Sequence, residues 1–277
     1  MLKLMFITNS IDVAKIAQGS GVDRIFIDLE YIGKSERQSG LDTVKSTHTI
    51  QDIARIRPYL KQSELLVRCN PIHNQTEFYS SSEDEINTII KNGADIIMLP
   101  YFKSREEVEK FLKYVNGRVK TILLFETKES VDILDSILSL PGIDEVFIGL
   151  NDLSLSYQKK FMFELLSDGT VDKIVKVFKQ HNIPFGFGGI ASLGKGLLPS
   201  EYIIKEHYRL GSSIVILSRS FCNVSNNIVD INHLFNSEIK KIRDFENTCL
   251  HLDNYEFYQN KIEIKNKIND ILKGMNS

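Results

Sequence analysis

The chain has 277 residues, of which 42% are hydrophobic and 25% are charged. Its 34 basic and 36 acidic residues nearly cancel, so the net charge of −2 gives no general attraction to nucleic acid or to an anionic membrane. The apolar content excludes a disordered chain, and six prolines and sixteen glycines exclude collagen-like and low-complexity sequences. No apolar stretch approaches the roughly 18 residues that a membrane span needs.

Three cysteines (Cys69, Cys222 and Cys249) lie far apart and form neither a C-x-x-C pair nor a disulfide framework. The opening MLKLMFITNS lacks a long apolar core, so it reads as a first strand rather than as a signal peptide. We therefore expect a protein of a reducing, cytoplasmic compartment. Its length suits one domain over residues 1–277.

Short apolar runs recur along the chain at intervals that leave room for helices. Most are continuous in Ile, Val, Leu and Phe, as strands covered on both faces require. The expected strands are Leu2–Thr8, Arg24–Asp28, Leu65–Cys69, Asp95–Leu99, Thr121–Glu126, Glu145–Gly149, Pro184–Gly188 and Ser213–Leu217.

The segments between these runs place apolar residues three and four apart, which predicts helices. The predicted helices are Ile50–Tyr59, Glu83–Asn92, Arg105–Val115, Ser130–Leu140 and Tyr202–Leu210. About eight alternations of strand and helix favour a (β/α)8 TIM barrel. The alternative, an open doubly wound sheet, usually has a glycine-rich fingerprint after the first strand, where this chain has Thr8-Asn9-Ser10.

Two regions exceed the repeat. Residues 29–47 are polar and rich in Gly and Ser, and as a loop after the second strand they would lie at the C-terminal mouth of the barrel. Residues 252–277 form an amphipathic C-terminal helical extension, which either closes the base of the barrel or docks on a neighbouring subunit.

Polar residues stand at the ends of several predicted strands and would converge on the barrel mouth. They are Asp28 and Glu30 after the second strand, Arg68 after the third, Glu126 after the fifth and Asp152 after the sixth. Glu126 and Asp152 are oxygen ligands of the kind that suits Mg²⁺ or Mn²⁺, and such an ion can hold both oxygens of a 2-oxo acid. Arg68 adds a cation whose fork matches a carboxylate. The alternative is structural: Glu126 accepts backbone hydrogen bonds and Asp152 caps a helix.

One long segment resembles the metal-binding stretch of the HpcH/HpaI aldolase and citrate lyase β-subunit family. In that pattern a strand ends in Glu-Thr, a helix follows, and a Pro-Gly-x-Asp turn leads into a strand that ends Ile-Gly-x-Asn-Asp-Leu-Ser. The matching residues are Glu126-Thr127, Pro141-Gly142-Ile143-Asp144 and Ile148 to Ser154. Further matches follow in the family's order at Ile27 to Glu30, Val67 to Pro71 and Gly93 to Pro100, so the resemblance covers roughly residues 2–220.

The resemblance implies a barrel of the phosphoenolpyruvate/pyruvate superfamily, whose members make or break a carbon–carbon bond beside an enolate. It implies that Glu126 and Asp152 are metal ligands, that Arg68 neutralises the substrate carboxylate or enolate, and that Asp28 and Glu30 lie near the metal-bound water. It also implies that the turn of Gly149, Leu150 and Asn151 offers N–H groups to a substrate carboxylate. A homo-oligomer is expected from the same likeness.

Three positions depart from the family pattern. Aldolase members often carry His where this chain has Tyr31 and Gln where it has Leu124, and position 150 is Leu where Pro or Ala is common. The proton-transfer groups therefore do not carry over from the family. The candidate base is His48, which follows the polar loop, or a metal-bound water positioned by Asp28 or Glu30. For His48, an exposed helix-start histidine is the structural alternative.

Three functions are compatible with these residues. The first is a metal-dependent carbon–carbon lyase or aldolase that acts on a pyruvate-like 2-oxo acid. The second is a citrate lyase-like lyase or thioesterase that acts on an acyl-CoA. The third is a non-catalytic barrel that binds a ligand and has lost its acid/base group.

Overall fold

The computed structural model describes residues 1–34, 47–222 and 227–276 of the chain. Most of the loop expected over 29–47 therefore lies outside the described residues. Within the described part, eight parallel strands form a closed barrel in which each strand pairs with the next and β8 pairs with β1. The strands are β1 (Lys3–Ile7), β2 (Arg24–Asp28), β3 (Glu64–Arg68), β4 (Ile96–Leu99), β5 (Lys120–Phe125), β6 (Glu145–Ile148), β7 (Phe185–Ile190) and β8 (Ile214–Leu217).

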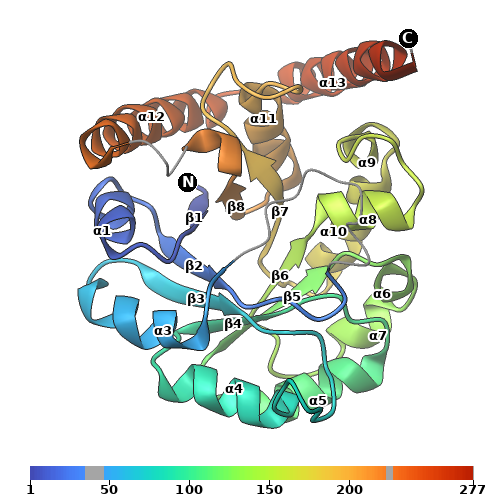
Figure 1. Ribbon diagram of the computed structural model, residues 1–277. Helices are drawn as coiled ribbons and strands as arrows, with labels where there is room; N and C mark the ends of the chain where they lie inside the picture. Colours follow the sequence, from blue (N-terminus) through green and yellow to red (C-terminus); the bar gives the residue numbers. More distant parts are fainter. Residues whose placement is uncertain (35–46, 223–226, 277) are drawn as a thin grey trace.

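Helices lie around the strands and cover the outside of the barrel (Figure 1). They are α1 (Ile11–Gly19), α3 (Ile50–Ile56), α4 (Ser82–Lys91), α5 (Arg105–Val115), α6 (Lys128–Asp132), α7 (Leu134–Leu138), α8 (Leu150–Ser156), α9 (Glu164–Ser167), α10 (Thr170–Gln180), α11 (Ser200–Leu210), α12 (Ile228–Cys249) and α13 (Asn254–Asn276). The predicted (β/α)8 barrel with an extra C-terminal helix is confirmed.

Two predicted helices are shorter than expected. The helix predicted over Ile50–Tyr59 ends at Ile56 and continues as a 3₁₀ turn over Arg57–Tyr59, which contains a proline that cannot donate a backbone hydrogen bond. The helix predicted over Ser130–Leu140 is two short helices that meet at Ile133. By contrast, α5 has the predicted bounds, because Ser104 and Glu107 form a capping box at its start.

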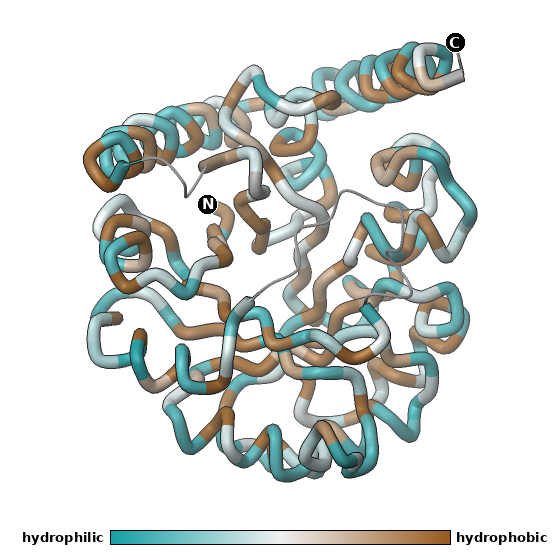
Figure 2. The backbone as a smooth tube through the Cα atoms, viewed as in Figure 1, coloured by the Kyte–Doolittle hydropathy of each residue, from teal (hydrophilic) through white to brown (hydrophobic). Residues whose placement is uncertain are grey.

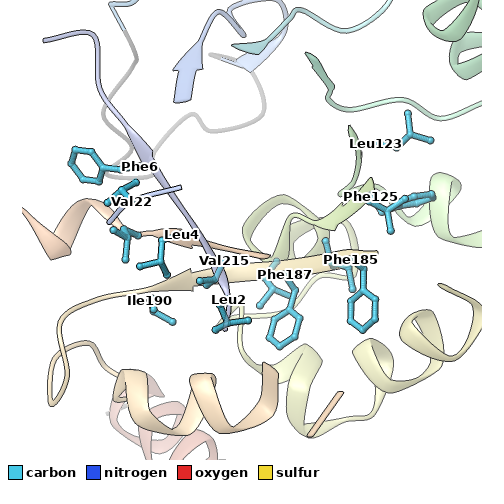
Figure 3. Close-up of a cluster of buried hydrophobic side chains, with 14 of the residues drawn as sticks. Leu2, Leu4, Phe6, Val22, Leu123, Phe125, Phe185, Phe187, Ile190 and Val215 are labelled. Atoms are coloured by element: carbon cyan, nitrogen blue, oxygen red, sulfur yellow. The ribbon is translucent and has the colours of Figure 1, made fainter. Parts of the chain in front are cut away.

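The strands are hydrophobic on both faces because each face packs against a different core. Residues that point outward from the barrel, such as Leu4, Phe125, Phe187 and Val215, pack under the helices (Figure 3). Residues that point inward fill the barrel itself, and these are Met5, Phe26, Leu66, Ile96, Met98, Ile122, Leu124, Phe147 and Ile214. Figure 2 shows the hydrophobic strands inside and the hydrophilic stretches on the outer helices.

An ion-pair cluster closes the N-terminal end of the barrel. The guanidinium of Arg24 is fully buried and donates to both carboxylate oxygens of Glu145, at 2.6 and 2.7 Å. It also donates to Glu64 at 2.9 Å, its direct neighbour across the β2–β3 register. This end of the barrel is therefore closed by paired charges, and the other end holds the polar residues expected to form a site.

The C-terminal extension is a helix, as predicted, but it packs on the side of the barrel. Helix α13 contacts α11 and α9, and α12 lies against α1 and α11 (Figure 1). Within the described residues, no helix combines the length and apolar character needed to cross a membrane.

Candidate active site

At the barrel mouth, the register of the sheet places two charged side chains next to each other. Asp28 and Arg68 are direct partners in the pairing of β2 with β3. Because side chains alternate along a strand, Asp28 lies on the same inward face as Phe26, and Arg68 lies on the same inward face as Leu66. Glu30, two residues after Asp28, continues the inward face beyond the end of β2 and is 2% exposed.

Arg68 is bound by both acidic residues of the second strand. Its Nε and Nη2 donate to the two oxygens of Asp28 at 2.8 Å each, and its Nη1 lies 3.2 Å from Glu30. Burial would raise the pKa of Asp28, but the charges of Arg68 and Lys34 hold it below its usual range. The fork that the sequence suggested for a substrate carboxylate is therefore occupied by Asp28, and Arg68 serves as a fixed positive charge at the mouth.

Lys34 is a member of this cluster that the sequence-based prediction missed. Its Nζ lies 2.8 Å from Asp28 and 3.5 Å from Glu30, and the residue is 8% exposed. A lysine four residues after an acidic residue was the available signal, although here a turn rather than a continuous helix joins Glu30 to Lys34.

Glu126 lies at the end of β5, among negative charges. Its Oε1 accepts the backbone N–H of Tyr101 at 2.9 Å. Burial raises the pKa of Glu126 well above the ordinary value of 4.5, and the charges of Glu30 and Asp152 raise it further. Arg68 acts in the opposite direction but does not cancel these effects. The mouth thus brings the carboxylates of Glu30 and Asp152 close enough to Glu126 for their charges to act on it.

Gly149 lies so close to Glu126 that an added side chain would crowd it. A Cβ atom on Gly149 would lie 2.8 Å from Oε2 of Glu126 and 2.9 Å from its Cβ. The pairing of Phe125 with Ile148 places these two residues next to each other at the ends of β5 and β6. Asp152 follows in the first turn of α8, where its Oδ1 accepts the side-chain amide of Asn151 at 3.0 Å.

The turn that leads into α8 does not offer all three of the N–H groups expected from the sequence. The N–H of Gly149 donates to the carbonyl oxygen of Phe125 at 3.0 Å, so it extends the strand ladder. The N–H groups of Leu150 and Asn151 belong to the first turn of α8, whose N–H groups have no acceptor within the helix. The side chain of Leu150 is 1% exposed.

His48 lies against the backbone at the end of β2. Its Nδ1 accepts the backbone N–H of Asp28 at 3.0 Å, so the neutral ring carries its proton on Nε2. Burial lowers the pKa of His48 below 6.5. Tyr31 also lies on this side, and its hydroxyl donates to the carbonyl oxygen of His48. The structure thus places His48 against the backbone of Asp28, one of the acidic residues with which the sequence-based prediction grouped it.

The donor set at the mouth fits a divalent cation. Carboxylate oxygens are the ligands that Mg²⁺ and Mn²⁺ prefer, and Glu126 shares its surroundings with the negative charges of Glu30 and Asp152. In the part of the chain that the structure describes, no three or more His, Cys, Asp or Glu side chains are grouped closely enough to hold a metal ion by themselves. Mg²⁺ is commonly bound by two protein carboxylates, and its remaining coordination positions stay open to water or substrate.

The sequence also matches a known protein family. A family model described as HpcH/HpaI aldolase/citrate lyase matches residues 3–178. The 2-keto-3-deoxy-L-rhamnonate aldolase of Escherichia coli strain K12 is 25% identical over 178 residues, which cover 52% of this chain and 57% of that protein. The chain therefore spans little more than half the length of the curated relatives that it matches.

Solved structures of similar proteins share the barrel. The HpcH/HpaI aldolase from Desulfitobacterium hafniense DCB-2 superposes with a TM-score of 0.61 at 15% identity, over 91% of this chain and 94% of that chain. A protein of the HpcH/HpaI aldolase/citrate lyase family from Burkholderia cenocepacia J2315 gives a TM-score of 0.60 at 14% identity, over 88% and 94%. At these identities the likeness concerns the fold.

Proposed function

This chain belongs to the HpcH/HpaI aldolase/citrate lyase family, and from that premise we propose that it is a class II aldolase, a carbon–carbon lyase that acts on a pyruvate-like 2-oxo acid with a divalent metal. The observation that carries the proposal is the excess of negative charge around Glu126 at the barrel mouth. The named activity of the Escherichia coli relative concerns a 2-keto acid, so 2-keto-3-deoxy-L-rhamnonate is the first substrate to test.

The metal would be held by Glu126 and Asp152, as Mg²⁺ or Mn²⁺. When bound, it would polarise the carbonyl of the 2-oxo acid and favour the negative charge that develops there. Arg68, already fixed by Asp28 and Glu30, contributes a second positive charge in a water-poor site. The N–H groups of Leu150 and Asn151 are the proposed donors to the substrate carboxylate.

In the cleavage direction, the bond between the third and fourth carbons of the 2-oxo acid breaks. Its electron pair stays with the fragment that carries the carbonyl group, and the hydroxyl proton of the other fragment leaves as the aldehyde forms. We assign the acceptance of this proton to a carboxylate oxygen of Glu30, directly or through one water, because Glu30 lies 3.2 Å from Arg68 and its charge acts on Glu126. Asp28 would position Arg68. His48, with its Nδ1 bound to the Asp28 N–H, would position Asp28 rather than take the proton.

The test is Glu126→Gln, assayed with Mg²⁺ and Mn²⁺ on 2-oxo acids and, in the reverse direction, on pyruvate with a panel of aldehydes. Loss of a metal ligand is expected to lower kcat/KM by about 100-fold or more, as for other groups that stabilise developing charge. Glu129→Gln is the matched control, since this carboxylate lies three residues away with its side chain 53% exposed. Wild-type turnover by Glu126→Gln would refute the proposal.

The same assay separates the alternatives. Release of free thiol from CoA thioesters, without turnover of oxo acids, would identify an acyl-CoA lyase or thioesterase. Binding of a divalent metal without turnover of either substrate class would identify a non-catalytic ligand-binding barrel.

We also propose that the protein is a cytoplasmic homo-oligomer. The three cysteines are buried and unpaired, as a reducing compartment favours. Tyr255 and Tyr258 on α13 are 68% and 60% exposed, and such aromatic residues are enriched in protein interfaces. Size-exclusion chromatography with light scattering tests the oligomer, which a monomer at micromolar concentration would exclude.

A further inference from the structure

A cavity of about 380 Å³ lies beside the barrel mouth, on the other side of the second strand's end. It is formed by the segments that follow β2 and β3 and by the first turns of α3 and α4. Leu29 and Tyr31 line it, and because side chains alternate along an extended segment, Asp28 and Glu30 point the other way. Neither Glu126 nor Asp152 is among the described residues of its wall. Its volume is within the range of small-molecule sites.

Aromatic side chains form much of the wall. Tyr31, Phe78 and Tyr79 all line the cavity and are 36%, 82% and 40% exposed. Large aromatic side chains that remain exposed next to a concave surface offer flat faces for an apolar ring to pack against.

A buried carboxyl group lies in the wall with one oxygen unsatisfied. Glu85, in the first turns of α4, is 7% exposed. Its Oε1 accepts two hydrogen bonds from Asn70, one from the backbone N–H at 3.1 Å and one from the side-chain amide at 2.9 Å. Its Oε2 is buried and has no hydrogen-bond partner among the described residues. A buried acceptor without a partner costs about 1–3 kcal/mol, so this oxygen favours any ligand that brings a donor.

The ring nitrogens of His73, in the same wall, have hydrogen-bond partners within the chain. Nδ1 lies 2.7 Å from the carbonyl oxygen of Pro71 and 3.0 Å from Oγ of Ser82, and Nε2 lies 2.8 Å from the carbonyl oxygen of Ser80. The wall therefore leaves the unsatisfied oxygen of Glu85 for a ligand. A neutral donor loses less hydration on entering such a cavity than a charged one.

We propose that this cavity is a binding site for a small neutral molecule that carries a hydroxyl group on an apolar ring. The hydroxyl donates to Oε2 of Glu85, and the ring packs against Phe78 and Tyr79. The site is separate from the proposed metal site, and its occupation is measured as binding, without substrate or metal, so the outcome is independent of the aldolase proposal.

The test uses two compounds of similar size, benzyl alcohol and its isomer anisole, titrated at millimolar concentration and followed by saturation-transfer NMR. They have the same atoms, but only benzyl alcohol can donate a hydrogen bond. Benzyl alcohol is expected to bind about tenfold more tightly, as one hydrogen bond to a carboxylate provides. Equal binding of the two isomers, or binding of neither, would overturn the proposal.

Three variants locate the site. Glu85→Gln replaces the free acceptor by an amide donor and is expected to abolish the preference for benzyl alcohol. Glu83→Gln, an exposed residue of the same helical turn, is expected to keep it. Phe78→Ala removes an exposed side chain that the fold does not need, and it is expected to weaken the binding of both isomers several-fold. A preference that persists in Glu85→Gln, or affinities unchanged in Phe78→Ala, would place the binding elsewhere and refute the assignment.

Discussion

Replacement of Gly149 by alanine tests whether the position of Glu126 controls the proposed reaction. Gly149 has φ −80° and ψ 85°, and a negative φ is accessible to alanine, so the backbone itself is not the obstacle. The obstacle is the added Cβ, which would lie 2.8 Å from Oε2 of Glu126 and 2.9 Å from its Cβ. Ordinary contacts begin near 3.4 Å, so both the Cβ and the carboxylate of Glu126 must shift by about half an ångström.

The expected effects on stability and on activity differ in size. Overpacking costs about 1–3 kcal/mol, and the lower entropy of the unfolded alanine variant offsets about 0.4–1 kcal/mol of it. The free energy of unfolding is therefore expected to fall by about 1–2 kcal/mol, which leaves the barrel folded. Misplacement of a reacting group by this order of distance is expected to lower kcat/KM by about 10- to 100-fold.

Gly189→Ala is the matched control at the same mouth. The nearest atom to a Cβ there is the carbonyl oxygen of Ile216 at 3.5 Å, an ordinary contact. Urea unfolding followed by circular dichroism, divalent-metal titration calorimetry and kcat/KM on the 2-oxo acid substrate compare the two variants. If Gly149→Ala retains wild-type metal affinity and kcat/KM, then Glu126 is not a group whose position matters to the reaction, and our reasoning about the site is wrong.

Two further predictions concern the scaffold. Glu145→Gln leaves the buried guanidinium of Arg24 without full compensation, so urea unfolding should show a loss of about 3 kcal/mol, and a loss below about 1 kcal/mol would contradict the importance of this pair. His207 is fully buried against the ring of Phe187, with centroids 3.8 Å apart, and burial lowers its pKa to about 3. Because the unfolded chain takes up a proton below about pH 6.5 and the folded chain does not, the free energy of unfolding should fall by about 2 kcal/mol between pH 7 and pH 5. His207→Phe should remove that part of the slope, and an unchanged slope would show that another group causes it.

The positions of the strands were predictable because burial leaves a local mark. Apolar runs such as Arg24–Asp28 coincide with the strands of the structure, since a strand covered on both faces needs hydrophobic residues on both. Capping residues marked α5 in the same way, through contacts only three residues apart. The break at Ile133 had no such mark, and the structure shows two helices where periodicity predicted one.

The site residues were predictable as a group but not in their pairings. The sequence placed Asp28, Arg68, Glu126 and Asp152 at strand ends, and a parallel barrel gathers strand ends at one mouth whatever the details. The roles of individual groups were not predictable. That Arg68 is held by Asp28, forty residues earlier, depends on the β2–β3 register.

The sequence by itself determined that this chain forms a barrel with acidic residues at its mouth, because apolar runs and strand length are properties of short segments. Only the tertiary structure decided which of those residues are already engaged. In the structure the Gly149 N–H belongs to the strand ladder, His48 accepts the N–H of Asp28, and Lys34 joins the cluster. Such choices depend on distances between segments far apart in the chain, and no local pattern encodes these distances.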